Sequence, residues 1–308
     1  DQQNYKQTLE PHVQYVYTPY VKNQDKIPIF DTSETIFNYG NLYSINRFNG
    51  YDRIGDTNHI EAGVTSRILN DQGAEKFFFG LGQIYYLKNR IASINPEQIE
   101  TNQNKFINKQ QLNSRIAEAY QDRQSPLATK ILWHMTPEWS LSQDYVHNLK
   151  HNRIDQYTVG LNGRFKHNSV FNIGYSYLKQ PDRIVLTSTG QNTGKQVNGD
   201  LNVAETSFAL PLNSFTKLKD SFKIFGAWSY DITNKRNLNR MTGIQADTCN
   251  YQIRLVYRSY VNTTERVEVA KKKHGIFLQF VLKGLGDVAG NNMNTILKGI
   301  KGYQPGNE

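Results

Sequence analysis

Apolar and polar residues alternate along most of this chain, which is the pattern of β-strands with one apolar and one polar face. The alternation is clearest in residues 9–19, 155–165, 169–177 and 251–258, where aliphatic and aromatic side chains fall at every second position. Long helical periodicity is hard to find. The pattern predicts an all-β fold with twelve strands, at about 8–20, 57–69, 74–87, 126–136, 138–148, 153–166, 169–179, 203–212, 221–231, 238–247, 249–259 and 275–285.

The predicted strands are long, since most of them cover 9–14 residues. Strands of ordinary globular proteins average about 5–6 residues. A strand that crosses a bilayer at a tilt needs about 9–11 residues. Strand length therefore favours a membrane barrel over a soluble sandwich.

The connections between the strands are sorted by length. When they are numbered along the chain, the four long ones, of 36, 38, 23 and 15 residues, are all odd-numbered. The even-numbered connections are short turns, the longest being NSFTKLKD. Long extracellular loops and short periplasmic turns are typical of outer-membrane barrels. We therefore expect a transmembrane antiparallel β-barrel with strands over about 8–285 and a periplasmic C-terminal tail, 286–308.

Composition agrees with such a barrel. The 308 residues include 19 Tyr and 15 Phe, although the mean hydropathy is only −0.64; this combination suits strands that meet membrane interfaces. The net charge of +9 is spread along the chain without a nucleic-acid motif, so we expect no nucleic-acid partner. The first residues, DQQNYKQTLEP, have neither the basic nor the apolar region of a signal peptide, and the sequence opens on Asp1 and not on methionine, so we expect a mature chain, a cut domain or a fragment.

Catalytic chemistry finds little support in the sequence. No HExxH, GxSxG or P-loop motif occurs. His147 and His151 are four residues apart, but they flank a predicted turn and are interpreted as interfacial polar residues. We therefore expect neither an enzyme nor a metal or other cofactor.

The first long connection is rich in arginine, aspartate, glycine and aromatic residues. Charge-assisted pairs among Arg47, Asp52 and Arg53 could fold the loop onto itself, and its glycines allow turns. Its aromatic residues Tyr43, Phe48 and Tyr51 could pack it into the barrel mouth. We expect an ordered extracellular loop built around Arg47, Phe48, Gly50, Asp52 and Arg53.

Cys249 is the only cysteine, and it falls in a predicted tight turn on the periplasmic side. Because the periplasm is kept oxidising, a thiol there is expected to form a disulfide, and its partner would lie outside this chain. An inert cysteine in a turn is the alternative, and the residues alone leave both open.

Five blocks of the sequence occur in an order that resembles a known family. They are LEPHVQYVYTPY, FNGYDRIGDTNHIEAGVTSRIL, GLGQIYYL, CNYQIRLVYR and FLQFVLKGLG. Together they resemble the C-terminal part of LptD, the lipopolysaccharide-assembly family of the Gram-negative outer membrane. The likeness extends from about residue 8 to 303.

The resemblance implies a 26-stranded barrel with an N-terminal periplasmic jellyroll, of which this chain would hold about the last twelve strands. It implies an outer-membrane translocon that receives lipopolysaccharide from an LptA-like periplasmic bridge. The lipopolysaccharide would then enter the outer leaflet through a lateral gate between the first and last strands. An LptE-like lipoprotein would plug the lumen, and outer-membrane lipid would surround the barrel.

The resemblance also implies roles for particular residues. Cys249 matches the first of two family cysteines that pair with the N-terminal region, whereas Asn250 replaces the second. Arg164 and Arg254 would face a polar lumen, where they could hold phosphates. The last strand, 275–285, would be one edge of the gate, with Phe277, Gln279, Val281, Lys283, Gly284 and Gly286.

Three other classes remain open on the residues. The runner-up is a general outer-membrane porin or substrate channel. An outer-membrane lipid hydrolase would need a nucleophile that the spacing does not single out. A soluble β-sandwich binding protein is the third.

Overall fold

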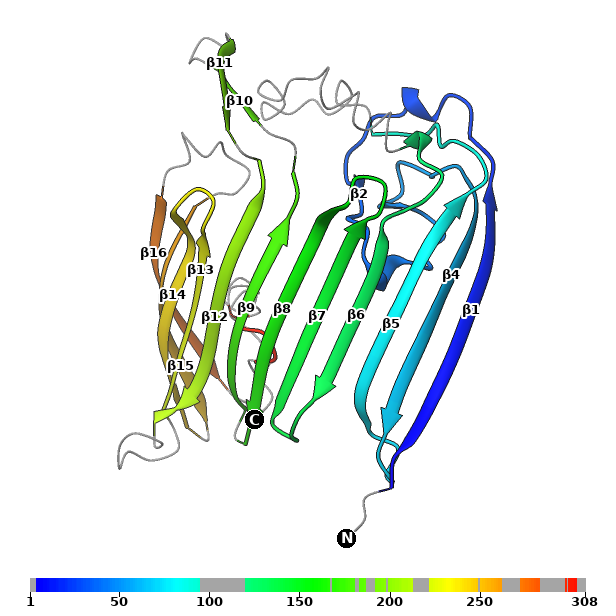
Figure 1. Cartoon of the computed structure of the whole chain (residues 1–308). Coiled ribbons are helices and arrows are strands. Elements are labelled where there is room, and N and C mark those ends of the chain that lie inside the picture. The colour runs from blue at the N-terminus through cyan, green and yellow to red at the C-terminus, as the bar shows by residue number, and fades with distance from the viewer. Residues whose placement is uncertain are drawn as a thin grey trace. The chain divides into compact units, whose positions relative to one another are not determined.

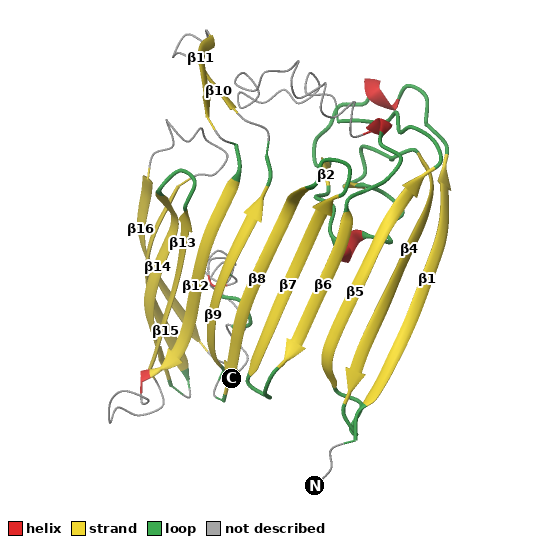
Figure 2. Ribbon diagram, in the orientation of Figure 1, coloured by secondary structure: helices red, strands yellow, loops and turns green. Residues whose placement is uncertain are grey.

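A computed structural model describes residues 4–94, 120–166, 168–180, 183–186, 192–197, 199–212, 222–248, 250–261, 272–282, 297 and 299–303. Strands dominate this part of the chain (Figure 1, Figure 2). Two single turns of 3-10 helix are η1 (Gln24–Lys26) and η2 (Tyr39–Asn41). Among the described residues, no helix is long and apolar enough to cross a membrane.

The strands are β1 (Lys6–Thr18), β2 (Ser33–Glu34), β3 (Phe48–Asn49), β4 (Thr57–Leu69), β5 (Glu75–Tyr86), β6 (Leu127–His134), β7 (Trp139–Asn148), β8 (Arg153–Phe165), β9 (Ser169–Leu178), β10 (Arg183–Leu186), β11 (Asn192–Val197), β12 (Leu201–Pro211), β13 (Phe222–Asp231), β14 (Arg236–Asp247), β15 (Tyr251–Val261) and β16 (Lys272–Leu282).

Twelve of these strands form one sheet in the order β1, β4, β5, β6, β7, β8, β9, β12, β13, β14, β15, β16. The prediction of an antiparallel fold with twelve long strands is confirmed, and each predicted segment ends within three residues of the observed strand. The sequence pattern did not predict the pairs β2–β3 and β10–β11. β2 and β3 have only two residues each, which is too short for alternation to be recognised.

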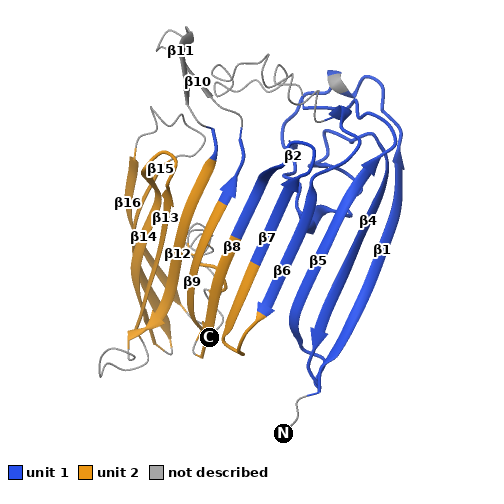
Figure 3. Cartoon of the chain, viewed as in Figure 1, with its two compact units in different colours: residues 1–133, 143–158, 177–200 blue, residues 134–142, 159–176, 201–308 orange. Residues whose placement is uncertain are grey.

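The chain divides into two compact units (Figure 3). Unit 1 comprises residues 1–133, 143–158 and 177–200, and unit 2 comprises residues 134–142, 159–176 and 201–308. Strands β7, β8 and β9 contribute residues to both units.

In unit 1, the apolar face of β1 is the exposed one. Leu9 and Val13 are 71% and 73% exposed, and Tyr15 and Tyr17 on the same face are also exposed. The opposite face carries His12, whose ring packs edge-on against that of Tyr43 from the loop. An apolar face turned outward is the reverse of a water-soluble sheet and agrees with a strand that meets lipid.

In unit 2, β15 and β16 show the same arrangement. Leu255 pairs with Leu278, and both side chains are exposed. Arg254 pairs with Gln279, and both are buried. β16 therefore has an exposed apolar face with Leu278 and an opposite face on which Gln279 is buried.

Candidate functional site

In unit 1, the connection between β1 and β4 folds down onto one face of β4 and β5. A Cβ atom at Gly82 would lie 2.2 Å from Cδ2 of Leu42, and one at Gly80 would lie 2.2 Å from Cζ of Tyr39. The Tyr39 hydroxyl lies 2.7 Å from Oγ1 of Thr65 on β4. Because these two glycines lack side chains, the loop approaches the sheet closely enough for Leu42 to be fully buried.

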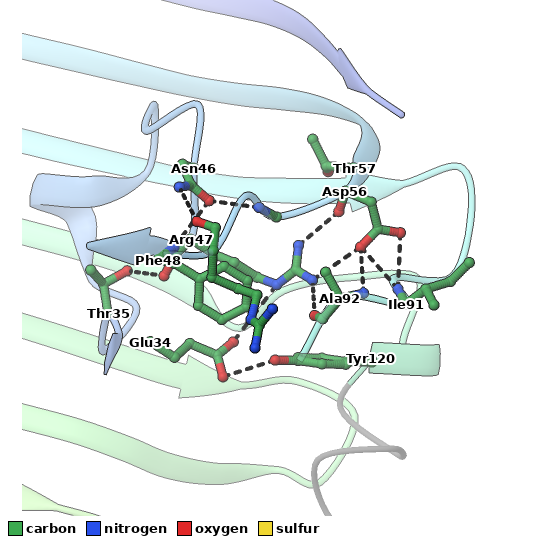
Figure 4. A network of polar contacts seen from close by, with 12 residues as sticks. Glu34, Thr35, Asn46, Arg47, Phe48, Asp56, Thr57, Ile91, Ala92 and Tyr120 are labelled. Atoms are coloured by element: carbon green, nitrogen blue, oxygen red, sulfur yellow. Dashed lines mark hydrogen bonds and ion pairs between the residues drawn. The ribbon is translucent and has the colours of Figure 1, made fainter. Parts of the chain in front are cut away.

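Arg47 is the centre of a polar network that joins two of the long connections (Figure 4). Its guanidinium donates from Nη1 to the backbone oxygen of Asp56 at 2.7 Å and from Nη2 to Oδ1 of the same residue at 3.2 Å. It also donates to the backbone oxygen of Ala92. The Asp56 carboxylate accepts from the amide of Ile91 at 2.9 Å and from the amide of Ala92 at 2.7 Å. The pair therefore fastens the segment after β5 to the end of the first loop.

Glu34 and Tyr120 complete this network. The Tyr120 hydroxyl donates to Oε2 of Glu34 at 3.0 Å, and Nε of Arg47 lies 4.0 Å from Oε1. The Arg47 guanidinium lies 5.0 Å from the centre of the Tyr120 ring, and that of Arg90 lies 3.6 Å from the centre of the Tyr86 ring. Burial raises the pKa of Tyr120 and also that of Glu34, although the hydrogen bond from Tyr120 and the two arginines oppose the shift at Glu34.

Arg53 fixes the start of the loop. It is 1% exposed and donates to the backbone oxygen of Gln24 and, at 3.3 Å, to that of Ile27. The amide of Ile54 donates to the side-chain oxygen of Gln24 at 3.1 Å. Arg47 and Arg53 thus donate to backbone carbonyls, and Arg47 also donates to Asp56, whereas the sequence suggested pairs among Arg47, Asp52 and Arg53.

Asp52 and Gly50 shape the exposed tip of the loop. The Asp52 carboxylate accepts from the amides of Phe30 and Asp31 at 2.8 Å and 3.1 Å, and these bonds lower its pKa. Gly50 has φ of 79°, a left-handed conformation that glycine adopts without strain. Tyr51 is 95% exposed, so it does not pack the loop into the barrel mouth as expected.

A cavity of about 460 Å³ lies beside the Arg47 network, entirely within unit 1. Its walls come from the loop, from β4 and β5, and from residues around β6 to β8; the charged and aromatic ones are Glu34, Phe37, Arg47, His59, Tyr86, Arg90, Tyr120, Asp122, His151, Arg153 and Asp155. Several of these charges are already paired, as in the 2.8 Å contact between Arg153 and Asp155. Within the described ranges, no group of three or more His, Cys, Asp or Glu residues could hold a metal ion.

A buried polar row on β4 was missed by sequence reasoning. Nε2 of His59 lies 2.7 Å from Oε1 of Glu61, and the other ring nitrogen contacts the hydroxyl of Thr57. All three side chains are buried on the face that the loop covers. The alternating sequence TNHIE (57–61) is the signal that could have found them, because it places three polar groups on one face of a strand.

The two predicted lumen residues, Arg164 and Arg254, lie in unit 2. Arg164 is exposed, and its guanidinium lies next to Gly302. Arg254 is 2% exposed and donates to the side-chain oxygens of Gln245 at 2.8 Å and Gln279 at 3.0 Å. The arginine is therefore held by amides within unit 2, and its predicted role in binding phosphate remains a prediction.

The predicted gate residues are only partly covered. Phe277, Gln279 and Val281 lie on β16, which pairs with β15 over its full length. Lys283, Gly284 and Gly286 lie outside the described residues, and so does Cys249.

Ionisation of Glu34 gives the first testable prediction. Burial raises the pKa of the Glu34 carboxyl above the ordinary 4.5, so Glu34 binds its proton more tightly in the folded protein than in the unfolded protein. The protonated Glu34 side chain therefore stabilises the fold fully below about pH 4.5, and this stabilisation is lost as the pH rises through the raised pKa of the folded protein. The Glu34→Gln variant should escape this loss, so the difference between its melting temperature and that of the unchanged protein should grow with pH and then level off.

Asp52→Asn serves as the control of opposite sign. The pKa of Asp52 is lowered below 3.8, so its contribution is present above that pH and lost as pH falls. Melting temperatures measured from about pH 3 to about pH 8 would check both variants. A constant difference for Glu34→Gln across that range would contradict the assignment.

Comparison with known proteins identifies the family. The family model described as "LptD: LPS transport system D" matches residues 1–216. The LPS-assembly protein LptD of Pseudomonas putida (strain W619) is 33% identical over 318 residues, which cover 98% of this chain and 32% of that protein. The LPS-assembly protein LptD of Legionella pneumophila (strain Lens) is 33% identical over 305 residues, covering 97% of this chain and 34% of that protein.

The chain thus spans about a third of the length of these relatives. Among solved structures, the P. putida toluene transporter TodX aligns with 91% of this chain and 77% of its own, at 10% identity and a TM-score of 0.24, which is too low to support an inference. The family model covers 216 of the 308 residues, and the relatives align along nearly all of the chain. The chain belongs to the LptD family.

Proposed function

We propose that this chain is the C-terminal barrel part of a translocon that inserts lipopolysaccharide into the outer leaflet of the outer membrane. The observation that carries the proposal is membership of a family of lipopolysaccharide-transport proteins of the Gram-negative outer membrane, which are not enzymes. The outward apolar faces of β1, β15 and β16 support the same location, since strands in lipid carry apolar side chains outward and polar ones toward the lumen.

β16 is proposed as one edge of a lateral gate. It stands at one end of the twelve-stranded order and β1 at the other, and it is hydrogen-bonded to β15. In the complete protein, its free edge would meet the first strand of the barrel. A seam in lipid opens only if few hydrogen bonds must be broken, because each unpaired backbone group costs several kcal/mol there.

The first long loop is proposed to keep the extracellular end of unit 1 in a fixed shape. Arg47 and Asp56 tie this loop to the segment after β5, and Arg53 ties its two ends together. The adjoining cavity, lined by paired charges and aromatic rings, suits polar groups better than acyl chains.

The partners follow from the same proposal. An LptA-like periplasmic bridge would deliver lipopolysaccharide to an N-terminal jellyroll, and an LptE-like lipoprotein would occupy the lumen. The C-terminus would lie in the periplasm, and the Cys249 thiol would pair with a cysteine of the N-terminal region.

The gate is tested in the full-length protein by joining β16 to the first barrel strand. A cysteine at Gln279, paired with one at the facing position of the first strand, should stop lipopolysaccharide from reaching the cell surface once the disulfide forms. Surface lipopolysaccharide is measured with and without a reductant, and export should return when the bond is reduced. Unchanged export with a fully formed crosslink would overturn the gate.

A matched crosslink controls for general damage. Cysteines at Leu255 and Leu278 join β15 to β16, which are already paired and do not form the proposed seam. This second crosslink should leave export intact.

A further inference from the structure

The face of unit 2 that carries the buried Arg254 and Gln279, named here its inner face, also carries an apolar patch, although a barrel lumen is expected to be polar. The patch takes one residue from each of five strands, β9 and β12 to β15: Val170, Ala209, Phe225, Met241 and Val256. Other residues on the same face are polar: Gln245 lies four residues after Met241 on β14, and Arg254 lies two residues before Val256 on β15. Ala209 faces Phe225 across the ladder, and Phe225 and Val256 both face Gly243. A cluster of apolar residues on a polar face indicates a surface that receives another apolar element.

The chain's own C-terminal segment covers this patch. Residues 297 and 299–303, named here the C-terminal strap, bury Leu297, Ile300 and Tyr303 against it. Leu297 is fully buried, and the Tyr303 ring stacks on that of Phe225 with their centres 6.5 Å apart. In Figure 1 the strap is the red trace near β9.

Two polar contacts fix the strap to β9 and β14, between which β12 and β13 lie in the sheet order. Nδ2 of Asn172 on β9 donates to the backbone oxygen of Lys301 at 2.9 Å. The Tyr303 hydroxyl donates to Oε1 of Gln245 on β14 at 2.9 Å. Gly302, between these two anchors, has φ of 78°, so a left-handed turn lets both sides of the strap reach their partners.

We infer that the C-terminal strap is an internal brace that holds β9 and β12 to β15 as one block on the lumen side. The twist between neighbouring strands of a sheet varies, from about −10 to about −35°. A segment that crosses several strands and is anchored at β9 and β14 restricts that angle. The brace confines changes of sheet curvature to strands that it does not cross.

The sequence explains why alternation does not reveal the strap. Its residues come after the last strand, in the sequence LKGIKGY (297–303), which has no strand pattern. The apolar residues that receive it look like ordinary irregularities on the polar faces of five separate strands.

Hydrogen exchange of the full-length protein tests the brace, with the double variant Leu297→Ser, Ile300→Ser. The variant loses the apolar anchors and should release the strap. Amides of β9 and β12 to β15 should then exchange at least about tenfold faster, whereas those of β4 and β5 should keep their rates. The control variant Ile36→Ser replaces an exposed isoleucine in unit 1 and should change neither group.

Hydrogen exchange of the strap itself gives a second check of the brace. In the unchanged protein, the amides of Ile300 and Tyr303 should be protected, because they donate to the backbone oxygens of Leu297 and Ile300. If they exchange freely, or if the double variant frees them without affecting β9 and β12 to β15, the brace is overturned.

A milder variant covers the case in which the double variant does not fold. Tyr303→Phe removes only the hydroxyl that reaches Gln245, and it should raise exchange in β14 more than in β4. An equal change of the exchange rates in β14 and β4 would overturn the brace. No lipopolysaccharide is needed in either measurement, so failure of the brace is separate from failure of the proposed gate.

Discussion

Replacing Arg47 by alanine should lower the free energy of opening the first loop by about 3–5 kcal/mol. The substitution removes two bonds to Asp56 and one to Ala92, and it leaves the Asp56 carboxylate without its cation in a largely buried site. Hydrogen exchange at the amides of Ile91 and Ala92 would report the loss, because both donate to Asp56.

Arg67→Ala is the matched control for this experiment. Arg67 also pairs with two acidic residues, Glu10 and Glu75, but its side chain is 42% exposed and the distances are 3.6 Å and 3.7 Å. Exposed ion pairs contribute about 0–1 kcal/mol, so its removal should have little effect. Equal effects of the two substitutions would show that Arg47 is an ordinary surface charge.

Replacing Arg254 by alanine should destabilise unit 2 by about 3 kcal/mol. The side chain is 2% exposed, and its removal deprives Gln245 and Gln279 of a charged donor inside the sheet. Thermal unfolding of the folded protein would measure the change. Arg254→Lys should recover only part of the stability, because a lysine ammonium cannot reproduce the planar, two-sided geometry of the guanidinium.

Arg240→Ala controls for the loss of positive charge, since Arg240 is an exposed residue of neighbouring β14. It should change the melting temperature little. If Arg254 served only to hold phosphates in transit, Arg254→Ala would leave stability unchanged and reduce lipopolysaccharide export alone. The two outcomes therefore distinguish a structural arginine from a substrate-binding one.

Family membership narrows the function classes that the residues had left open. A hydrolase is excluded as the family's activity, and a general porin is not supported, because the relatives are lipopolysaccharide-assembly proteins.

The strands could be predicted from the sequence because their signal is local. Alternation with a period of two residues depends only on neighbours in the chain, and it also assigns each side chain to a face. Leu255 and Leu278 are exposed and Arg254 and Gln279 buried, as their positions in the pattern required. Connection lengths likewise gave the antiparallel order of the sheet.

The loop contacts and the C-terminal strap were decided by the tertiary structure. Composition identified Arg47 and Arg53 as candidates to order the loop, but their partners, Asp56, Ala92 and Gln24, depend on how two long connections meet. Tyr303 is 58 residues from Gln245, and no periodic pattern links them. Local periodicity determines strands and faces, whereas contacts between distant segments depend on the shapes that those faces present after folding.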